Sequence, residues 1–428
     1  MSGIFGTFCN SIHTQDKNKK KLILWNNAYG RDAKQIFEKN NIQIGCCLQM
    51  LATHTTTSPI LHMNSMYAAI DLLLYNREEL IIKCNAPTSI SDEELLLSYL
   101  TQFGMSALKD VNGDFSGVIY DENAQTLTLF RDHMGIRPLY YYADNSFMAF
   151  STDIRGLLGL DGVDSSLNED WIYRTLSGYF VDSVTSTEYQ NIFCVSPASY
   201  ITFSIKNEKI SQEIHSYWQL GKKKIHYTSF ELYKAKLKEL VTDSIQRRLQ
   251  AIPGKAGAEL SGGLDSGVIG ILIHRLGRDC VYFSWSVDPN EIPYADHDER
   301  LIIKDICKQE HIQCHYSQMK SDRSMNSLLA RQMQSLGFSL DENEPPALRY
   351  AMPPYINAMA LCDSCSCMHE NGASVIFTGH GGDEGISHRS SPYEMFYHHE
   401  YYHFFRSMWS STPVSYTHLR AHETPEHL

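Results

Sequence analysis

The run Leu260-Ser261-Gly262-Gly263-Leu264-Asp265-Ser266-Gly267 decides the fold expected for this chain of 428 residues. Residues 256–260 before it have the composition of a short strand, and the apolar residues 268–276 after it have that of a helix. Two glycines at such a junction let the backbone turn sharply, so that its N–H groups and the positive end of the helix favour a phosphate. Ser261 and Ser266 add hydroxyl donors, and Asp265 can hold the divalent cation that accompanies a nucleotide. No Gly-Lys-Ser/Thr follows, which excludes a Walker A loop; the simpler alternative is a Gly-rich turn capped by Asp or Ser.

The complete run, set between a strand and a helix, resembles the pyrophosphate-binding loop of the ATP pyrophosphatase superfamily. Members of that superfamily cut ATP to AMP and pyrophosphate. The pattern then continues with an apolar strand at 280–287, an amphipathic helix at 298–310 and a strand at 375–378. This alternation predicts an α/β doubly wound parallel sheet, with ligands at the carboxyl ends of its strands.

Three predicted strand ends are therefore the places to look for a site. They are Leu260 with its loop, the segment from Trp285 to Val287, and the run Thr378-Gly379-His380-Gly381-Gly382-Asp383-Glu384. The last run resembles the second signature of the asparagine synthetase family within this superfamily. The resemblance implies that Asp383 joins Asp265 on Mg²⁺, and that the backbone of Thr378, Gly379, Leu260 and Trp285 borders an adenylate. A Gly-rich surface turn is the alternative for this run taken alone.

His380, Asp383 and Glu384 are the expected catalytic residues of this second signature. His380 stands where asparagine synthetases carry Glu and where β-lactam-forming relatives carry Tyr. A neutral imidazole can take the proton from an attacking amine. The alternative is a loop histidine hydrogen-bonded to the backbone.

The N-terminal part is predicted to be an α+β sandwich of short strands with one or two helices. A strand-like start at residues 1–6 is followed by strands at 42–51, 115–120, 126–130 and 147–151. A helix is predicted at 92–102, because Ser91 can act as its N-cap and Glu94 completes a capping box.

The start of the chain, NGDFSGVIYD at 112–121, RDHMGIRPLYY at 131–141 and STDIRGLL at 151–158 resemble the glutaminase domain of asparagine synthetases. The resemblance implies an Ntn-hydrolase-like sandwich, with a cysteine nucleophile as the second residue. This chain has Ser2, and a hydroxyl is not nucleophilic without an added base. The family arginine expected at 48–53 is absent from LQMLAT, and the family Asn-Gly-Glu is replaced by residues 71–73, Asp-Leu-Leu. Only Asp92 is retained, so glutamine hydrolysis is expected to be lost and the domain to act as a scaffold.

Composition sets further limits. The net charge of −12, with no basic tract to compensate for it, argues against a nucleic-acid-coating surface, and the one dense basic run, residues 17–21, is expected to be a solvated loop. No apolar run approaches the roughly 18 residues of a membrane span, and no signal peptide is recognisable. The 11 cysteines are expected to be reduced thiols in a cytoplasmic protein.

Three other clusters have competing interpretations. Cys362, Cys365 and Cys367 suggest zinc, but they lack a second pair at matching spacing and lie where a helix is expected, which favours ordinary thiols. Asp298 and Glu299 can hold substrate or simply supply charge to a helix N-terminus. Residues 341–346 resemble a family Asp-Glu-Pro loop that borders the substrate pocket, and the helix at 229–249 is expected to pack on the sheet.

The predicted organisation is a glutaminase-like domain at 1–160, a connecting segment at 161–225 and an ATP-binding synthetase domain at 226–413. Residues 414–428 have no apolar period and no cap, and they resemble translated adapter sequence rather than family sequence. We therefore expect the synthetase domain to be C-terminally truncated, since family members carry further helical residues there, including a lysine that contacts the phosphates.

The function implied is asparagine synthetase-like, ATP-dependent amide-bond formation. A small-molecule or peptide carboxylate is adenylated with Mg²⁺, and ammonia or a substrate amine then attacks. With its altered glutaminase residues, the pattern is closer to that of β-lactam synthetases and lasso-peptide cyclases. A non-catalytic fragment or pseudoenzyme that only binds nucleotide is the alternative, and a homodimer is left open.

Overall fold

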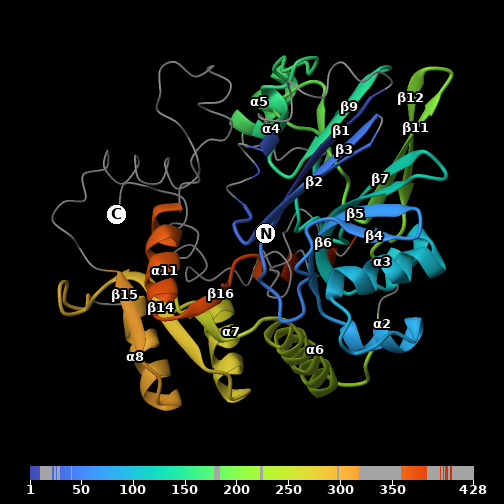
Figure 1. Cartoon of the computed structure of the whole chain (residues 1–428). Helices are drawn as coiled ribbons and strands as arrows, with labels where there is room; N and C mark the ends of the chain where they lie inside the picture. The colour runs from blue at the N-terminus through green and yellow to red at the C-terminus, as the bar shows by residue number, and fades with distance from the viewer. Residues whose placement is uncertain are drawn as a thin grey trace.

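A computed structural model describes residues 1–9, 29–39, 41–177, 184–221, 225–295, 298–317 and 358–382, with a few single residues between and beyond them. The chain forms an antiparallel sandwich followed by a parallel α/β unit (Figure 1). Residues 341–346, Asp383, Glu384 and the tail at 414–428 lie outside the described residues.

The sandwich consists of two six-stranded sheets. The first has the order β10-β8-β9-β1-β3-β2 and the second has the order β12-β11-β7-β6-β5-β4. The strands of the first sheet are β1 (Gly3–Cys9), β2 (Ala33–Lys39), β3 (Ile42–Leu48), β8 (Tyr140–Ala143), β9 (Phe147–Ser151) and β10 (Ile192–Cys194). Those of the second are β4 (Leu61–Met63), β5 (Met66–Leu74), β6 (Gly113–Asp121), β7 (Thr126–Arg131), β11 (Ser199–Lys206) and β12 (Lys209–Ser216).

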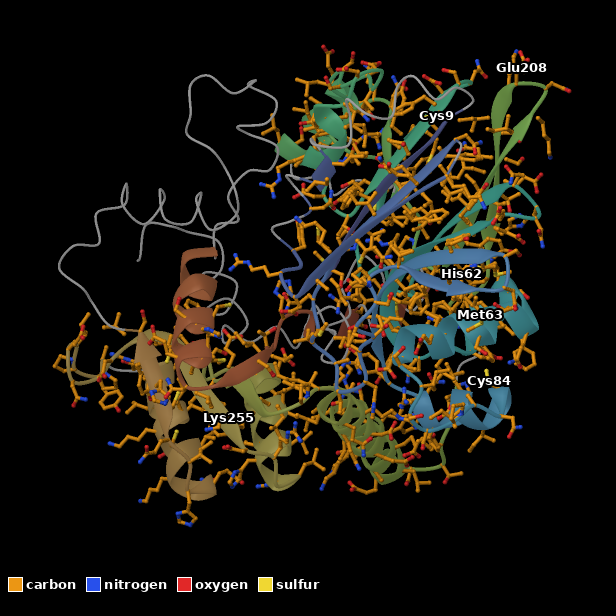
Figure 2. The ribbon with its side chains drawn as sticks, in the orientation of Figure 1. Cys9, His62, Met63, Cys84, Glu208 and Lys255 are labelled. Carbon is orange, nitrogen blue, oxygen red and sulfur yellow. The ribbon has the colours of Figure 1, made fainter. Side chains whose placement is uncertain are left out.

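The main core lies between these sheets, where side chains of both inner faces meet (Figure 2). Phe8 and Ile44 come from the first sheet, and Val118 and Leu129 come from the second. Helices cover the outer faces. The second sheet is covered by α2 (Arg77–Cys84), α3 (Asp92–Phe103) and the 3-10 helix η2 (Met105–Asp110). The first sheet is covered by α4 (Arg155–Leu158), and α5 (Glu169–Leu176) follows α4 along the chain. The predicted α+β sandwich is therefore confirmed.

Helix α3 begins as its sequence predicts. The Ser91 hydroxyl accepts from the Glu94 amide, and the Glu94 carboxylate accepts in return from the Ser91 amide at 3.2 Å. These reciprocal bonds satisfy two of the free donors at the helix start. The strand predictions at the start of the chain and at 115–120, 126–130 and 147–151 also correspond to observed strands.

The sandwich extends beyond the boundary expected at residue 160. Strands β10, β11 and β12 lie inside the predicted connecting segment, yet they pair with β8 and β7 of the two sheets. The segment's polar turns concealed these short strands, because β12 alternates weakly and is largely exposed. Only the chain after about residue 217 leaves the sandwich.

The parallel unit has the strand order β15-β14-β13-β16, with all neighbours parallel. Its strands are β13 (Lys255–Glu259), β14 (Cys280–Val287), β15 (Cys314–Ser317) and β16 (Ala373–Phe377). Helices α7 (Leu264–Arg275) and α8 (Glu299–Glu310) cover one face, and α11 (Ala358–Glu370) covers the other. The chain order reverses between β13 and β16, and this switch point is where doubly wound sheets bind ligands.

The amphipathic helix expected at 229–249 is α6 (Phe230–Ala251), with the Ser229 hydroxyl accepting from the Leu232 amide. Its expected packing is only partly right. Ile245 and Leu249 join the core of the parallel unit, whereas Leu237 and Leu240 are 49% and 54% exposed. Only the C-terminal part of α6 therefore packs on the unit that follows it. In the part of the chain that the structure describes, no helix is both long and apolar enough to cross a membrane.

Candidate functional site

The glycine-rich loop joins β13 to α7 with the geometry that its sequence predicts. Gly262 has a positive φ of 83°, and Gly263 is the N-cap of α7, so the amides of the next residues open at the helix start. The helix begins at Leu264, earlier than the predicted 268, and it carries Asp265 in its first turn. The N-terminal end of a helix of this length attracts an anion.

The two serines of the loop bond to each other. The Ser266 hydroxyl lies 2.7 Å from the Ser261 hydroxyl and accepts from the Ser261 amide at 3.1 Å. Ser266 is only 3% exposed. Its hydroxyl therefore closes the loop on itself, while Ser261 is the more accessible of the two.

The second glycine-rich run lies directly against the first. A Cβ atom at Gly382 would stand 2.4 Å from Asp265 Cγ, and a Cβ atom at Gly379 would stand 2.6 Å from the Ser266 amide nitrogen. Only residues without a side chain permit this approach. The structure thus brings together two motifs that are far apart in the sequence, and Gly382 immediately precedes the predicted metal ligand Asp383.

Trp285 and Leu260 complete the switch point. Leu260 is fully buried and its amide donates to the Phe283 carbonyl at 2.9 Å, which holds β13 beside β14. Trp285 is 46% exposed at the end of β14, and Thr378 follows β16, where its hydroxyl lies 3.4 Å from the His380 amide. His380 is exposed. The described members of the predicted nucleotide site therefore gather at one edge of the sheet.

Glu259 is a site residue that sequence reasoning missed. It ends β13, opposite Phe283 of β14 in register, and its carboxylate lies near the Gly379 amide and the Trp285 indole. Burial raises the pKa of Glu259, while the Gly379 amide, nearby His380 and the Trp285 indole oppose that rise. The sequence feature that could have identified Glu259 as a site residue is its place as a carboxylate in the last position of a largely apolar strand.

The pair Asp298–Glu299 has a structural role. Asp298 caps α8 and forms an ion pair with Arg300 at 2.5 Å, and this hydrogen bonding lowers the pKa of Asp298 to about 2. The same guanidinium donates to the Val287 and Ile292 carbonyls. The Glu299 backbone lies against Gly262, where an added Cβ would stand 2.6 Å from the Glu299 oxygen. The helix-charge interpretation is the one supported, and α8 also buttresses the loop.

The N-terminal pocket is occupied by the protein's own charges. Ser2 is 1% exposed; its amide donates to Asp71 Oδ1 at 2.8 Å, and its hydroxyl accepts from the Gln49 amide at 3.1 Å. Asp71 Oδ2 faces Arg137 Nε at 3.4 Å, and both side chains are nearly buried. Arg137 lies in the quoted run at 131–141, but its approach to the N-terminus was not predicted. Its charge is already neutralised by a residue of the replaced 71–73 segment.

Two acids at the start of α3 lie close to this pocket. Asp92 is ion-paired with Arg77, and burial nevertheless raises its pKa. Glu93 is 2% exposed and accepts from the Thr56 amide at 2.8 Å, and burial raises the pKa of Glu93 to about 7. The retained Asp92 is thus held in an ion pair rather than open to a ligand.

The end of α6 joins the sandwich to the parallel unit. The Arg248 guanidinium lies 4.6 Å from the centre of the Tyr75 ring, and Arg247 pairs with Glu79 at 3.2 Å. The Thr53 amide donates to the Ala251 carbonyl at 3.0 Å. The segment that replaces the family arginine at 48–53 therefore adjoins the second unit.

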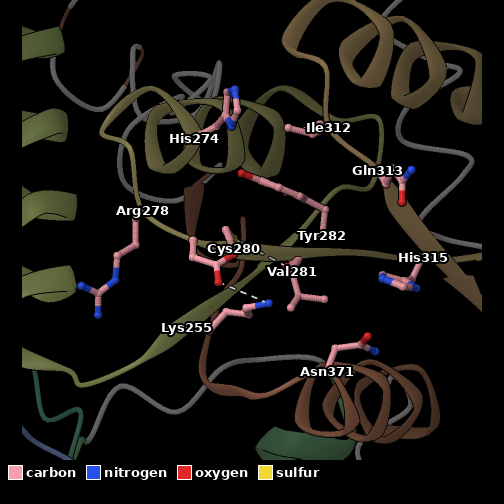
Figure 3. Close-up of a pocket in the computed structure, with 11 residues that line it drawn as sticks. Lys255, His274, Arg278, Cys280, Val281, Tyr282, Ile312, Gln313, His315 and Asn371 are labelled. Carbon is pink, nitrogen blue, oxygen red and sulfur yellow. Dashed lines mark hydrogen bonds and ion pairs between the residues drawn. The ribbon is translucent and has the colours of Figure 1, made fainter.

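A cavity of about 310 Å³ lies at the amino ends of β13 and β14, away from the switch point (Figure 3). Its cations already have partners. Lys255 pairs with Asp279 at 3.3 Å, and Arg278 donates to the Ile252 and Gly254 carbonyls. This cavity therefore offers little free charge for a ligand.

The cysteines of 362–367 lie on α11, as expected for thiols on a helix. From this helix, Cys367 packs against the core cluster that contains Met368, whereas Cys365 is exposed. Among the residues that the structure describes, no group of three or more His, Cys, Asp or Glu side chains is placed to hold a metal. Asp265 and Asp383 were predicted as a pair, and Asp383 is not among those residues.

Comparisons with known proteins identify the family to which each part of the chain is similar. A family model described as a glutamine amidotransferase domain matches residues 1–218, and one described as asparagine synthase matches residues 236–427. A putative glutamine-hydrolysing asparagine synthetase of Methanocaldococcus jannaschii is 27% identical over 80% of this chain, and the match covers 63% of that protein. The amidase chry2 of Gibberella zeae is 26% identical over 69% of this chain and 42% of its own length.

A solved glutamine phosphoribosylpyrophosphate amidotransferase from B. subtilis is 10% identical, with a TM-score of 0.35, over 82% of this chain and 97% of its own. That likeness is too weak to support an argument. The chain spans less than two thirds of the length of the curated relatives named above. The two family models, one matching half of the chain and the other most of the remainder, are decisive: the chain belongs to the asparagine synthetase family.

Proposed function

We propose that the chain binds ATP with Mg²⁺ at the switch point and uses it to activate a carboxylate for amide-bond formation. A carboxylate oxygen of the substrate attacks the α-phosphorus, and pyrophosphate leaves. Ammonia or a substrate amine then attacks the acyl-adenylate, and AMP leaves with the formation of the amide.

The contact between Gly382 and Asp265 carries this proposal. A phosphate loop alone is compatible with many activities. A second glycine-rich turn packed on its acidic residue places backbone donors on one side and a carboxylate on the other. This arrangement suits a nucleotide triphosphate and its cation.

The donor chemistry fits Mg²⁺, which prefers carboxylate oxygens and keeps part of its water shell. Asp265 would hold the ion together with Asp383, and the ion would neutralise charge that develops on the phosphates. Leu260, Ser261, Gly262, Gly263 and Ser266 would form the phosphate side, and Trp285, Thr378 and Gly379 would border the adenylate. Glu384 completes the proposed catalytic set.

His380 is proposed to accept the proton of the attacking amine. It is exposed at the edge of the switch point, three residues before Asp383. Glu259 lies close enough to interact electrostatically with it. His380→Ala should then abolish amide formation and leave pyrophosphate exchange into ATP intact; unchanged amide formation would remove His380 from the mechanism.

The sandwich is proposed to have lost glutamine hydrolysis and to serve as a scaffold. One replacement and two contacts support this: Ser2 stands in place of a thiol, its amide donates to Asp71, and Arg137 pairs with the same carboxylate. No free guanidinium is then available in the described pocket to bind the carboxylate of glutamine. Free ammonia or a substrate amine would supply the nitrogen, as β-lactam synthetases and lasso-peptide cyclases take it from their substrates.

The direct test is exchange of labelled pyrophosphate into ATP by the full chain with Mg²⁺. L-aspartate is the first carboxylate to try, followed by a panel of amino and peptide acids. Exchange that requires an acid and is lost in Asp265→Asn supports adenylation. ATP binding without exchange for any acid would instead favour a protein that only binds nucleotide, and no ATP binding would refute the proposed site.

A further inference from the structure

Two cysteines from neighbouring elements lie on the face of the parallel sheet that α8 covers, away from the switch point. Cys314 begins β15 and is in register with Tyr282 of β14. Tyr282 packs with Ile303 of α8, so side chains at this level of the sheet face that helix. Cys307, in the last turn of α8, and Cys314 both pack against the same core cluster.

The two thiols also lie near enough to shift each other's pKa in opposite directions. A hydrogen bond from Cys314 lowers the pKa of Cys307, and the same contact together with burial raises the pKa of Cys314. The single thiol proton of Cys314 can point at Cys307 or at the His315 carbonyl, which lies 3.4 Å away. Cys307 is therefore the more nucleophilic member, because the thiolate is the reactive form.

A small reagent can reach this pair. Both cysteines line an open cavity of about 350 Å³, together with Tyr294, Lys304 and His315. Both are free thiols of intermediate exposure. Lys304 lies one helical turn before Cys307, and its ammonium is 5.3 Å from the centre of the Tyr294 ring.

We propose that Cys307 and Cys314 form a thiol–disulfide exchange site that a small-molecule disulfide converts to an intramolecular disulfide. The Cys307 thiolate attacks one sulfur of the reagent, forms a mixed disulfide and releases one thiol. The Cys314 sulfur then attacks Cys307 Sγ and releases the second thiol. The two cysteines lose two electrons and two protons, which the two released thiols carry away.

The disulfide would fasten the end of α8 to the start of β15. The opposite end of α8 contacts Gly262 of the phosphate loop. The inference does not rest on the proposed catalytic function, because it needs only the two thiols and their cavity.

The test uses the full chain and oxidised glutathione, followed by alkylation, trypsin and mass spectrometry. Trypsin cleaves after Lys308, between the two cysteines, so the disulfide links peptide 305–308 to peptide 309–320. We expect this linked pair to form, to disappear on reduction, and to be absent from Cys307→Ser and Cys314→Ser. Cys365→Ser removes an exposed thiol on α11 and is the matched control that should retain it.

Two results would overturn the proposal. One is that Cys307 and Cys314 both stay reduced, and are therefore alkylated, under conditions in which Cys365 has formed a mixed disulfide with glutathione. The other is a Cys307–glutathione disulfide that persists while Cys314 stays free, since adjacent thiols would resolve it. Alkylation without an oxidant supplies a second measurement, in which Cys307 should react before Cys314.

Discussion

Replacing Arg137 by methionine should destabilise the sandwich strongly. The change removes the charge that faces Asp71 at 3.4 Å, and the Asp71 side chain is only 6% exposed. A buried charge left without its partner costs about 3–5 kcal/mol. The Ser2 amide still donates to Asp71, so we expect the lower end, about 3 kcal/mol, in Arg137→Met. For a domain of this size that corresponds to a fall in melting temperature of about 6–12 °C.

The ion pair itself should contribute much less than this loss. Asp71 Oδ2 and Arg137 Nε are both buried and stand slightly too far apart for a good hydrogen bond, and neither has another partner in the described structure. Asp71→Asn combined with Arg137→Met should therefore cost less than the two single changes together, by about 2 kcal/mol.

Urea unfolding of the parent chain, Asp71→Asn, Arg137→Met and the double variant gives the coupling free energy of the pair. Hydrogen exchange of β1 and β5 peptides shows where the structure is destabilised. Because the chain has more than one unit, the exchange data identify which transition belongs to the sandwich. Strictly additive costs, or a loss below about 1 kcal/mol in Arg137→Met, would show that the pair is not buried as described.

Three further predictions concern other parts of the molecule. The raised folded pKa of Glu93 means that the folded state holds a proton more tightly than the unfolded chain, so its stabilising contribution is full below about pH 4.5 and is lost as pH rises through about 7. Glu93→Gln should remove this pH dependence of the free energy of unfolding, whose full size is on the order of 3 kcal/mol, as measured by urea unfolding between pH 5 and 8. Gly382→Ala places a Cβ 2.4 Å from Asp265 Cγ and should weaken ATP binding by more than about tenfold in calorimetry. Ser2→Cys should release no more glutamate from glutamine than the parent chain, because the pocket's charges are already paired.

Each of these has its own control. Gly221→Ala meets no atom within 4 Å and should bind ATP normally, so equal binding by both alanine variants would contradict the contact at Gly382. A pH slope that survives in Glu93→Gln would assign it to another group. Glutamate release by Ser2→Cys above the parent level would show that the pocket still admits glutamine.

The sequence was most informative where local rules and packing agree. The capping box at Ser91 and Glu94, the β14 limits and the loop after β13 follow from short-range chemistry, and all three are observed. Strand β5 was not predicted, because its buried apolar run lacks the alternation that distinguishes a strand from a helix.

The features that the sequence did not predict are contacts between residues far apart in the chain. Nothing near Arg137 in the chain indicates that its side chain meets Asp71, and nothing near Glu259 indicates that Gly379 lies beside it. Both depend on how separate strands come together. In the same way, the exposed half of α6 has the periodicity of a packed helix, although only its last turns meet the core.

The pairing of β13 with β16 has a consequence for how the protein folds. Lys255 aligns with Ala373, so the switch point forms only after a long intervening chain has been closed into a loop. The length-dependent part of that entropic cost is about 4 kcal/mol for a flexible loop of some 120 residues. ATP bound across the two strands would recover about 2.7 kcal/mol at a hundred times its dissociation constant. Nucleotide would then act as a folding ligand as well as a substrate, and its absence would expose the chain to proteolysis at the stage when β16 has yet to join the sheet.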